Sequence, residues 1–135
     1  MPRPSVYLVR TALLHLLVGS GFGGLLLANK GLGFWPALWR LRPAHIELLL
    51  VGWTVQLTLG VAYWILPRFR GDRPRGDRRP VWAAYLLLNL GVIVLALGSW
   101  TPRAGALALV GRGAELAAVL LFAWNAWPRV KAAGA

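Results

Sequence analysis

The sequence predicts an all-α protein, a four-helix up-and-down transmembrane bundle. The chain has 135 residues, of which 58% are hydrophobic and 14% are charged, a composition typical of a membrane protein rather than of a soluble domain. Four apolar stretches each reach the roughly 20 residues that a helix needs to cross about 30 Å of hydrocarbon. Most charged residues lie between these stretches. We therefore expect one integral membrane domain over residues 1–135, surrounded by the lipid bilayer.

The expected spans lie at about 6–28, 44–66, 81–100 and 104–127. Pro2, Arg3 and Arg10 resemble the charged region of a signal peptide, but the apolar run is long and no small-residue cleavage site follows before Lys30, so we expect a retained helix. Its segment GSGFGG at 19–24 matches the G-x-G-x-x-G motif of dinucleotide-binding sites. Such a site needs the motif between a strand and a helix, and here it lies within an apolar span. We instead expect Gly19 and Gly23 to let another helix approach closely, either from this chain or from a second one.

The second span combines groups that lipid cannot satisfy. At about 100° per residue, one face carries the following residues within about 40°: His45, Gly52, Gln56, Leu59 and Tyr63. This stripe should face the bundle interior or another subunit. The glycine leaves room either for a flat cofactor or for a tightly packed helix. Glu47 lies about 200° from His45 and is expected at a subunit contact or at the membrane interface.

The third and fourth spans carry fewer polar groups. Asn89, in the third span, is expected to donate a hydrogen bond to another helix. Arg112 and Glu115 are spaced i,i+3 on the fourth span, which allows them to pair within the bilayer.

The charge distribution predicts the orientation. The net charge is +11, and the connection 68–80 is rich in arginine. With the N-terminus inside, the basic residues on the inner side are Arg3, Arg10, Arg68, Arg70, Arg73, Arg75, Arg78, Arg79, Arg129 and Lys131. Those on the outer side are Lys30, Arg40, Arg42 and Arg103. The positive-inside rule then places both termini in the cytoplasm, and tryptophans near the ends of the spans agree with interfaces there. The arginine-rich connection 68–80 is typical of a loop that contacts anionic lipid and not of a nucleic-acid-binding segment.

Residues 39–68, WRLRPAHIELLLVGWTVQLTLGVAYWILPR, carry a more specific pattern. A basic residue shortly precedes a histidine, a glycine and aromatic midsection follows, and G-x-x-Y…P ends the segment. The matching residues are Arg42, His45, Gly52, Trp53, Gly60, Tyr63 and Pro67. The pattern resembles the second transmembrane helix of subunit I of the haem-copper oxidases, and it is most similar to the cbb3-type oxidase and nitric oxide reductase branches. In that family the histidine is an axial ligand of the low-spin haem b, in the outer half of the membrane, where the charge count also places His45.

The resemblance implies a haem b site in a bacterial or archaeal cytoplasmic membrane, with His45 as the metal ligand. The expected cofactor-binding residues are His45 and Gly52, with Arg40, Arg42 or Arg112 meeting the haem propionates. His15, the one other histidine, lies about 20 Å down the first helix, too deep to share one iron with His45 unless the second helix starts well before Pro43. We expect His15 to be a packed or water-contacting residue. The iron would then be five-coordinate, or bound to water or to His45 of a second subunit.

The resemblance is loose outside this helix. Subunit I of the family has twelve or more spans, and its remaining metal ligands lie on later helices that have no counterpart here. The chain also has no cysteine, which excludes thiolate ligation and covalent c-type haem attachment. We therefore expect no complete oxygen- or nitric-oxide-reducing centre and no catalytic residues in this chain.

Two functional interpretations follow. The first is a small haem b-binding membrane protein, a cytochrome acting in electron transfer, haem handling or gas sensing. The alternative is a cofactor-free accessory or assembly subunit of a terminal oxidase or nitric oxide reductase in a respiratory chain. In both cases we expect a homo-oligomer formed through the first or second helix.

Overall fold

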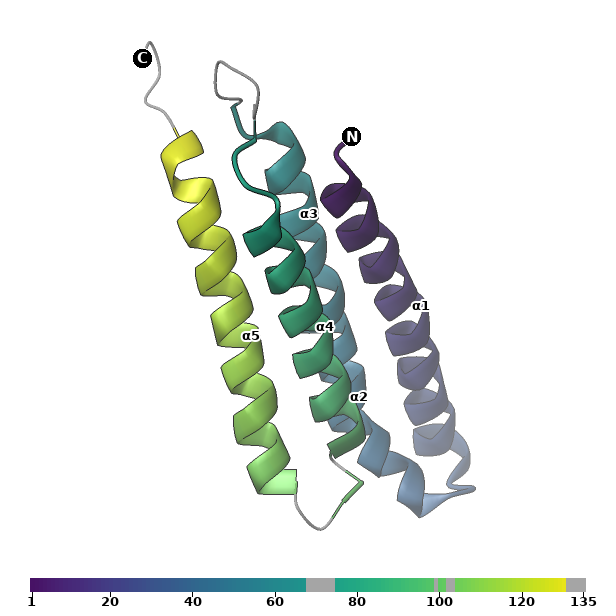
Figure 1. Ribbon diagram of the computed structural model, residues 1–135. Helices are drawn as coiled ribbons and strands as arrows, with labels where there is room; N and C mark the ends of the chain where they lie inside the picture. Colours follow the sequence, from purple (N-terminus) through teal and green to yellow (C-terminus); the bar gives the residue numbers. More distant parts are fainter. Residues whose placement is uncertain (68–74, 99, 102–103, 131–135) are drawn as a thin grey trace.

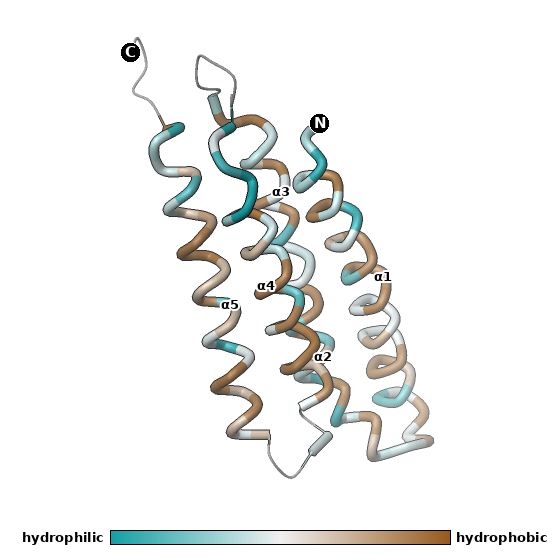
Figure 2. Tube along the Cα trace, viewed as in Figure 1, coloured by the Kyte–Doolittle hydropathy of each residue, from teal (hydrophilic) through white to brown (hydrophobic). Residues whose placement is uncertain are grey.

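The computed structural model of the protein describes residues 1–67, 75–98, 100–101 and 104–130. Four long helical rods lie side by side, and the described residues contain no strand (Figure 1). Each rod is long and apolar enough to cross a membrane, and apolar residues predominate along their length (Figure 2). The predicted all-α four-helix bundle is confirmed, and the chain is a multi-pass membrane protein.

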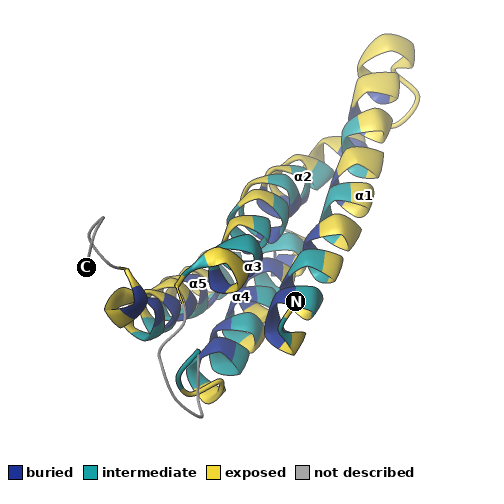
Figure 3. Cartoon of the chain, turned by 90° about the horizontal axis from the view of Figure 1, so that it is seen from above, coloured by how far each residue is buried: buried dark blue, intermediate teal, exposed yellow. Residues whose placement is uncertain are grey.

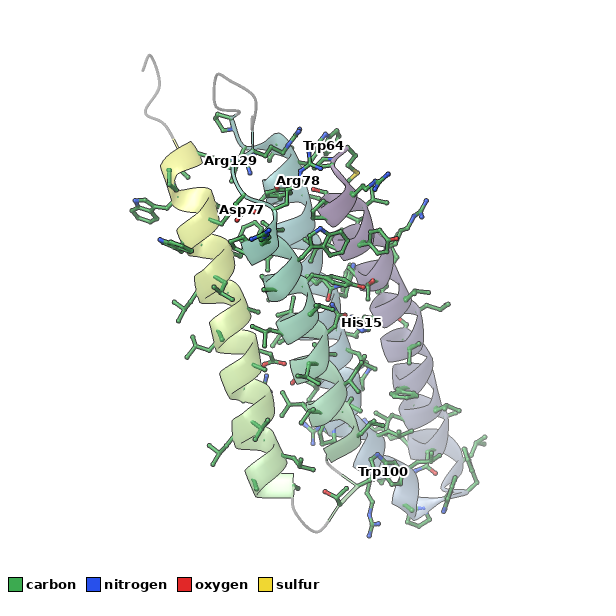
Figure 4. The ribbon with its side chains drawn as sticks, in the orientation of Figure 1. His15, Trp64, Asp77, Arg78, Trp100 and Arg129 are labelled. Atoms are coloured by element: carbon green, nitrogen blue, oxygen red, sulfur yellow. The ribbon has the colours of Figure 1, made fainter. Side chains whose placement is uncertain are left out.

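Both termini lie at one end of the bundle, which we call the terminal end (Figure 1). The other end, where Gly33–Trp35 connects the first two rods, is the opposite end. Of the basic residues used to predict the orientation, Arg68, Arg70, Arg73, Arg103 and Lys131 lie outside the described residues. Trp64 lies toward the terminal end and Trp100 toward the opposite end, as expected for interfacial tryptophans (Figure 4).

The first rod, α1 (Arg3–Leu32), is longer than expected at both ends. A proline in its first turn suits a helix start, because that turn leaves backbone N–H groups unpaired anyway. Gly33 ends the helix with φ 65°, and its N–H donates to the Asn29 carbonyl at 2.8 Å. The buried Asn29 side chain accepts a hydrogen bond from the Trp35 N–H at 2.8 Å, which fixes the turn into the second rod.

The second span (Pro36–Ile65) is a continuous rod of four segments with three helical conformations. It consists of the 3₁₀-helix η1 (Pro36–Arg40), the α-helix α2 (Leu41–Glu47), the π-helix η2 (Leu48–Val55) and the α-helix α3 (Gln56–Ile65). The rod begins eight residues before the expected start, because Pro36 can open a helical turn ahead of the arginines. The π-helix was not predicted from the sequence. Such segments are rare and occur frequently at functional sites.

The remaining rods form a hairpin. They are α4 (Arg79–Gly98) and α5 (Ala104–Ala126), the latter continued by the 3₁₀ turn η3 (Trp127–Arg129). The two helices of the hairpin are in close contact at Gly91 and Gly111. A Cβ added to Gly91 would lie 2.8 Å from the Gly111 carbonyl oxygen, and a Cβ added to Gly111 would lie 3.2 Å from the Gly91 carbonyl oxygen. Only glycines allow the two backbones to come so close.

The hydrophobic core lies in the half of the bundle near the terminal end. It consists of Leu8, Tyr63, Val81, Ala84, Leu88, Ala118, Phe122 and Ala126. These residues come from α1, α3, α4 and α5, so all four rods meet there. Buried residues face the bundle axis, whereas exposed residues cover the outside, as in a protein surrounded by lipid (Figure 3).

Candidate functional site

The two histidines lie along one seam, where α1 packs against the second span. His15 Nδ1, on α1, lies 2.9 Å from the Gly52 carbonyl oxygen in η2. His45 Nδ1, on α2, lies 2.8 Å from the Gly19 carbonyl oxygen in α1. Each rod thus contributes one imidazole and one glycine carbonyl. Figure 4 shows His15 near the middle of this seam.

Glycines provide the space for both rings. A Cβ on Gly23 would lie 2.7 Å from His45 Cε1, and a Cβ on Gly52 would lie 2.7 Å from His15 Nδ1. Both distances are shorter than a real side chain allows, so any larger residue would displace the ring. The expected close approach at Gly19 and Gly23 is therefore confirmed, and the partner helix belongs to the same chain.

The hydrogen bonds define the protonation of each neutral imidazole. Because a carbonyl oxygen only accepts, Nδ1 of His15 and Nδ1 of His45 must carry the proton. The lone pair then lies on Nε2 of each ring. This tautomer, with Nδ1–H held by a backbone carbonyl, is the one that histidine ligands of metals commonly adopt. In this tautomer Nε2 is the nitrogen of each ring that would bind a metal, and in His45 the ring edge that carries Nε2 packs against Gly23 of α1.

The seam keeps the two rings at different depths. His45 packs on Gly23 of α1, whereas His15 lies eight residues earlier on the same helix, a separation of about 12 Å along its axis. Although the second span starts earlier than expected, the two rings still lie at different depths. His15 is packed, as expected. The two imidazoles of one chain do not face each other across a single iron position. The described residues contain no group of three side chains that could together hold a metal ion.

The structure brings together only some of the predicted cofactor-binding residues. Gly52 lies on the same seam as His45, but its open face is filled by the His15 ring. Arg40 and Arg42 are exposed at the opposite end, where they could meet anionic groups of a bound molecule or of lipid. Arg112 lies on the other side of α2 from the seam, against Glu47.

Arg112 forms ion pairs with two carboxylates within the membrane. Its guanidinium donates to both oxygens of Glu47, with Nη1–Oε1 at 3.2 Å and Nη2–Oε2 at 2.6 Å. It also donates from Nη1 to Glu115 Oε2 at 2.7 Å. The predicted i,i+3 pair is confirmed. The expectation that Glu47 serves a subunit contact or the membrane interface is wrong, because this carboxylate is buried and forms an ion pair within the chain. A haem propionate at Arg112 would be the third carboxylate on one guanidinium.

An apolar groove runs beside the seam at the opposite end. It has a volume of about 320 Å³ and is formed by residues of α1, α2 and α4 with Trp100. Ala44 and Leu48 line it from the second span, and Val18 and Phe22 line it from α1. Each of these α1 residues directly precedes a glycine of the seam, so the groove and the His45 ring flank the same helix contact. This volume lies at the lower end of the range for small-molecule sites.

The sequence did not predict the role of Arg129, and it predicted the wrong acceptor for the hydrogen bond donated by Asn89. Arg129 is fully buried and donates from Nε to the Pro67 carbonyl at 3.0 Å and from Nη2 to those of Tyr63 and Leu66 at 3.0 and 2.8 Å. It therefore caps the end of α3, although the sequence suggested only a charge at the interface. Asn89 donates to the Tyr85 carbonyl of its own helix at 2.7 Å, so the expected interhelical donor is an intrahelical one.

Comparison with protein-family models, with characterised proteins and with solved structures yields no match for this chain.

Proposed function

We propose that the chain is a small membrane protein that binds haem b through Nε2 of His45, as a four-helix relative of haem-copper oxidase subunit I. The observation that carries the proposal is the hydrogen bond from His45 Nδ1 to the Gly19 carbonyl. It orients the ring and leaves Nε2 with the lone pair that iron requires. The oxidase-like pattern over residues 39–68 supports the same residue.

The residues around His45 fit a haem in their chemistry. One imidazole of the right tautomer adjoins a helix contact flanked by an apolar groove, and the exposed Arg40 and Arg42 lie nearby along the chain for the propionates. A bound haem would supply a one-electron redox centre or a gas-binding iron. The chain's own contribution would be to orient the imidazole, to exclude water with apolar side chains and to neutralise the propionates.

A second candidate is a cofactor-free accessory or assembly subunit of a terminal oxidase or nitric oxide reductase. The observation that favours it is the packing of the glycine surfaces. The His15 ring fills the space at Gly52, and the His45 ring fills that at Gly23, so the seam is closed by side chains of the chain itself. In this interpretation the two histidines lock α1 to the second span, and the partner is another membrane subunit.

The location and assembly are part of the proposal. We place the chain in a bacterial or archaeal cytoplasmic membrane with both termini in the cytoplasm, on the strength of the basic residues at the terminal end. We also propose a homo-oligomer. Only 17% of the most apolar window of α1 is buried within the chain, so most of that helix is available to lipid or to a second copy. In an oligomer, His45 of a second subunit could provide another ligand to the same haem.

Haem titration of the detergent-purified protein separates the two candidates. The haem proposal predicts a Soret band that saturates at no more than one haem per chain and that shifts on reduction. A protein that remains folded, by circular dichroism, but never develops this band would support the accessory subunit instead. Native mass measurement in mild detergent would give the number of chains in the same sample.

A further inference from the structure

A second polar cluster lies within the bundle, separate from the histidine seam. Glu115 is the central residue of α5, about 17 Å from either end of that helix. Its carboxyl meets Arg112, which is also bound to Glu47 of α2. Uncompensated charge is expensive at this depth in a bilayer, so the protonation state of the cluster has a strong physical constraint.

The charges of the cluster do not balance when all groups are ionised. One guanidinium faces two carboxylates, which leaves a net charge of −1. Both carboxylates are nearly buried, with side-chain exposures of 5% for Glu47 and 9% for Glu115. The neighbouring residues on α4 are Gly91, which lies against the Glu115 side chain, and Leu95, so that helix brings no titratable group to the cluster. The other basic residue nearby is Arg42, on the wall of the adjoining cavity.

The two carboxyl groups are not equivalent. Glu47 receives two hydrogen bonds from Arg112 in the bidentate arrangement typical of a strong ion pair. Glu115 receives one, at Oε2. Its other oxygen, Oε1, is buried and has no hydrogen-bond partner among the described residues. An ionised carboxylate with an unsatisfied buried oxygen is unfavourable, whereas a protonated oxygen removes the charge.

We propose that Glu115 is a proton-binding site, and that it is a neutral carboxylic acid at neutral pH while Glu47 and Arg112 form the ion pair. The cluster then carries no net charge within the bilayer. A cavity of about 360 Å³ adjoins it, lined by Arg42, Pro43, Ile46, Glu47, Leu95 and Arg112. Arg112, the partner of Glu115, lines this cavity together with Arg42, which is exposed at the opposite end, so we expect water that enters the cavity to exchange protons with the cluster. None of the contacts that carry this proposal involves His45.

Infrared spectroscopy tests the assignment directly, because the sequence contains only four acidic side chains: Glu47, Asp72, Asp77 and Glu115. The purified protein at pH 7, in lipid nanodiscs, should show the C=O stretching band of one protonated carboxyl group. The band should shift in D₂O, because the cavity allows exchange. It should disappear in Glu115→Gln and persist in Asp77→Asn, which alters an exposed carboxylate at the terminal end.

A second variant keeps the test valid if Glu115→Gln does not fold. In Glu47→Gln, Arg112 has only Glu115 as a charged partner, so Glu115 should ionise and the band should again disappear. The absence of a protonated-carboxyl band in the wild-type protein would overturn the proposal, and a band that depended on removing Na⁺ would assign the neutralising role to a cation instead. A band that survived in a folded Glu115→Gln variant would also overturn it, because the proton would then belong to another residue.

Discussion

At the scale of single residues, buried and half-buried polar side chains bind the backbone of neighbouring rods. His15 and His45 each donate to a glycine carbonyl across the seam. Gln56 Nε2 donates to the Leu8 carbonyl at 3.3 Å, and Arg129 binds three carbonyls at the end of α3. In a bilayer these bonds have no competition from water, so each specifies which rods are neighbours and in which register.

Replacing Arg129 by Gln should destabilise the bundle by about 2–4 kcal/mol, because three carbonyls at the end of α3 lose a charged donor. The guanidinium also lies 5.0 Å from the centroid of the Tyr63 ring, and this cation–π contact would be lost as well. Thermal unfolding in detergent, followed by circular dichroism, measures the effect. Arg78→Gln is the matched control, since Arg78 is exposed at the same end (Figure 4). Equal stability of the two variants would show that the cap contributes nothing.

At the scale of the elements, glycines and a π-helix determine how the rods fit. Gly19, Gly23, Gly52 and Gly60 form the surface between α1 and the second span. The π-helix lies at the centre of this surface and includes Gly52, whose carbonyl accepts the bond from His15. A π-helix turns less per residue than an α-helix. The π-helix therefore changes the rotation of α3 relative to α2 about the rod axis, and with it which residues of the two helices lie on the same face. Hence His45, Gly52 and Gln56 contact α1, whereas Tyr63 packs against Phe122 of α5.

Adjacent glycines of α1 provide a test of this seam. Gly23→Ala would place a methyl group 2.7 Å from His45 Cε1, so the ring must move and α1 must shift outward. We expect a loss of about 1–3 kcal/mol in unfolding free energy. Gly24→Ala meets nothing within 4 Å, and the alanine gains up to about 1 kcal/mol of helix propensity. Unfolding of both variants in detergent should therefore give opposite shifts, and equal shifts would contradict the packing described for His45.

At the scale of the whole molecule, the bundle is asymmetric from end to end. All four rods meet in the core near the terminal end, where Arg129 also caps α3. At the opposite end, the apolar groove lies among α1, the second span and α4, and the cavity lies between α2, α4 and Arg112 of α5. Among the described basic residues, more lie toward the terminal end than toward the opposite end, and on this we base the proposal that the terminal end is cytoplasmic. Those toward the terminal end are Arg3, Arg10, Arg75, Arg78, Arg79 and Arg129, and those toward the opposite end are Lys30, Arg40 and Arg42.

The proposed orientation can be measured with single cysteines, because the chain has none of its own. Lys30→Cys, near the opposite end, should react with a membrane-impermeant maleimide on intact cells. Arg75→Cys, at the terminal end, should react only after the membrane is permeabilised. Neither side chain is buried, so a difference in labelling reflects location rather than packing. The reverse pattern would invert the topology and place His45 in the inner half of the membrane.

Composition and periodicity were sufficient to predict the four rods, since the length of an apolar stretch is set by the thickness of a bilayer. The pairing of Arg112 with Glu115 followed from helical spacing in the same way. The pairing of Arg112 with Glu47 did not, because it depends on how α5 packs against α2 across 65 positions of sequence. The π-helix and the Arg129 cap were not predicted either. The cap depends on a contact between η3 and the end of α3, which no local sequence pattern specifies.

Comparison of His45→Ala with His15→Ala decides whether His45 binds haem iron through Nε2. Both changes remove one imidazole and one hydrogen bond across the same seam, so their structural costs are matched. The visible spectrum of each variant should be recorded after haem reconstitution, alongside the wild type. We expect the Soret band to be lost in His45→Ala and largely retained in His15→Ala. An unchanged Soret band in a folded His45→Ala variant would contradict this expectation.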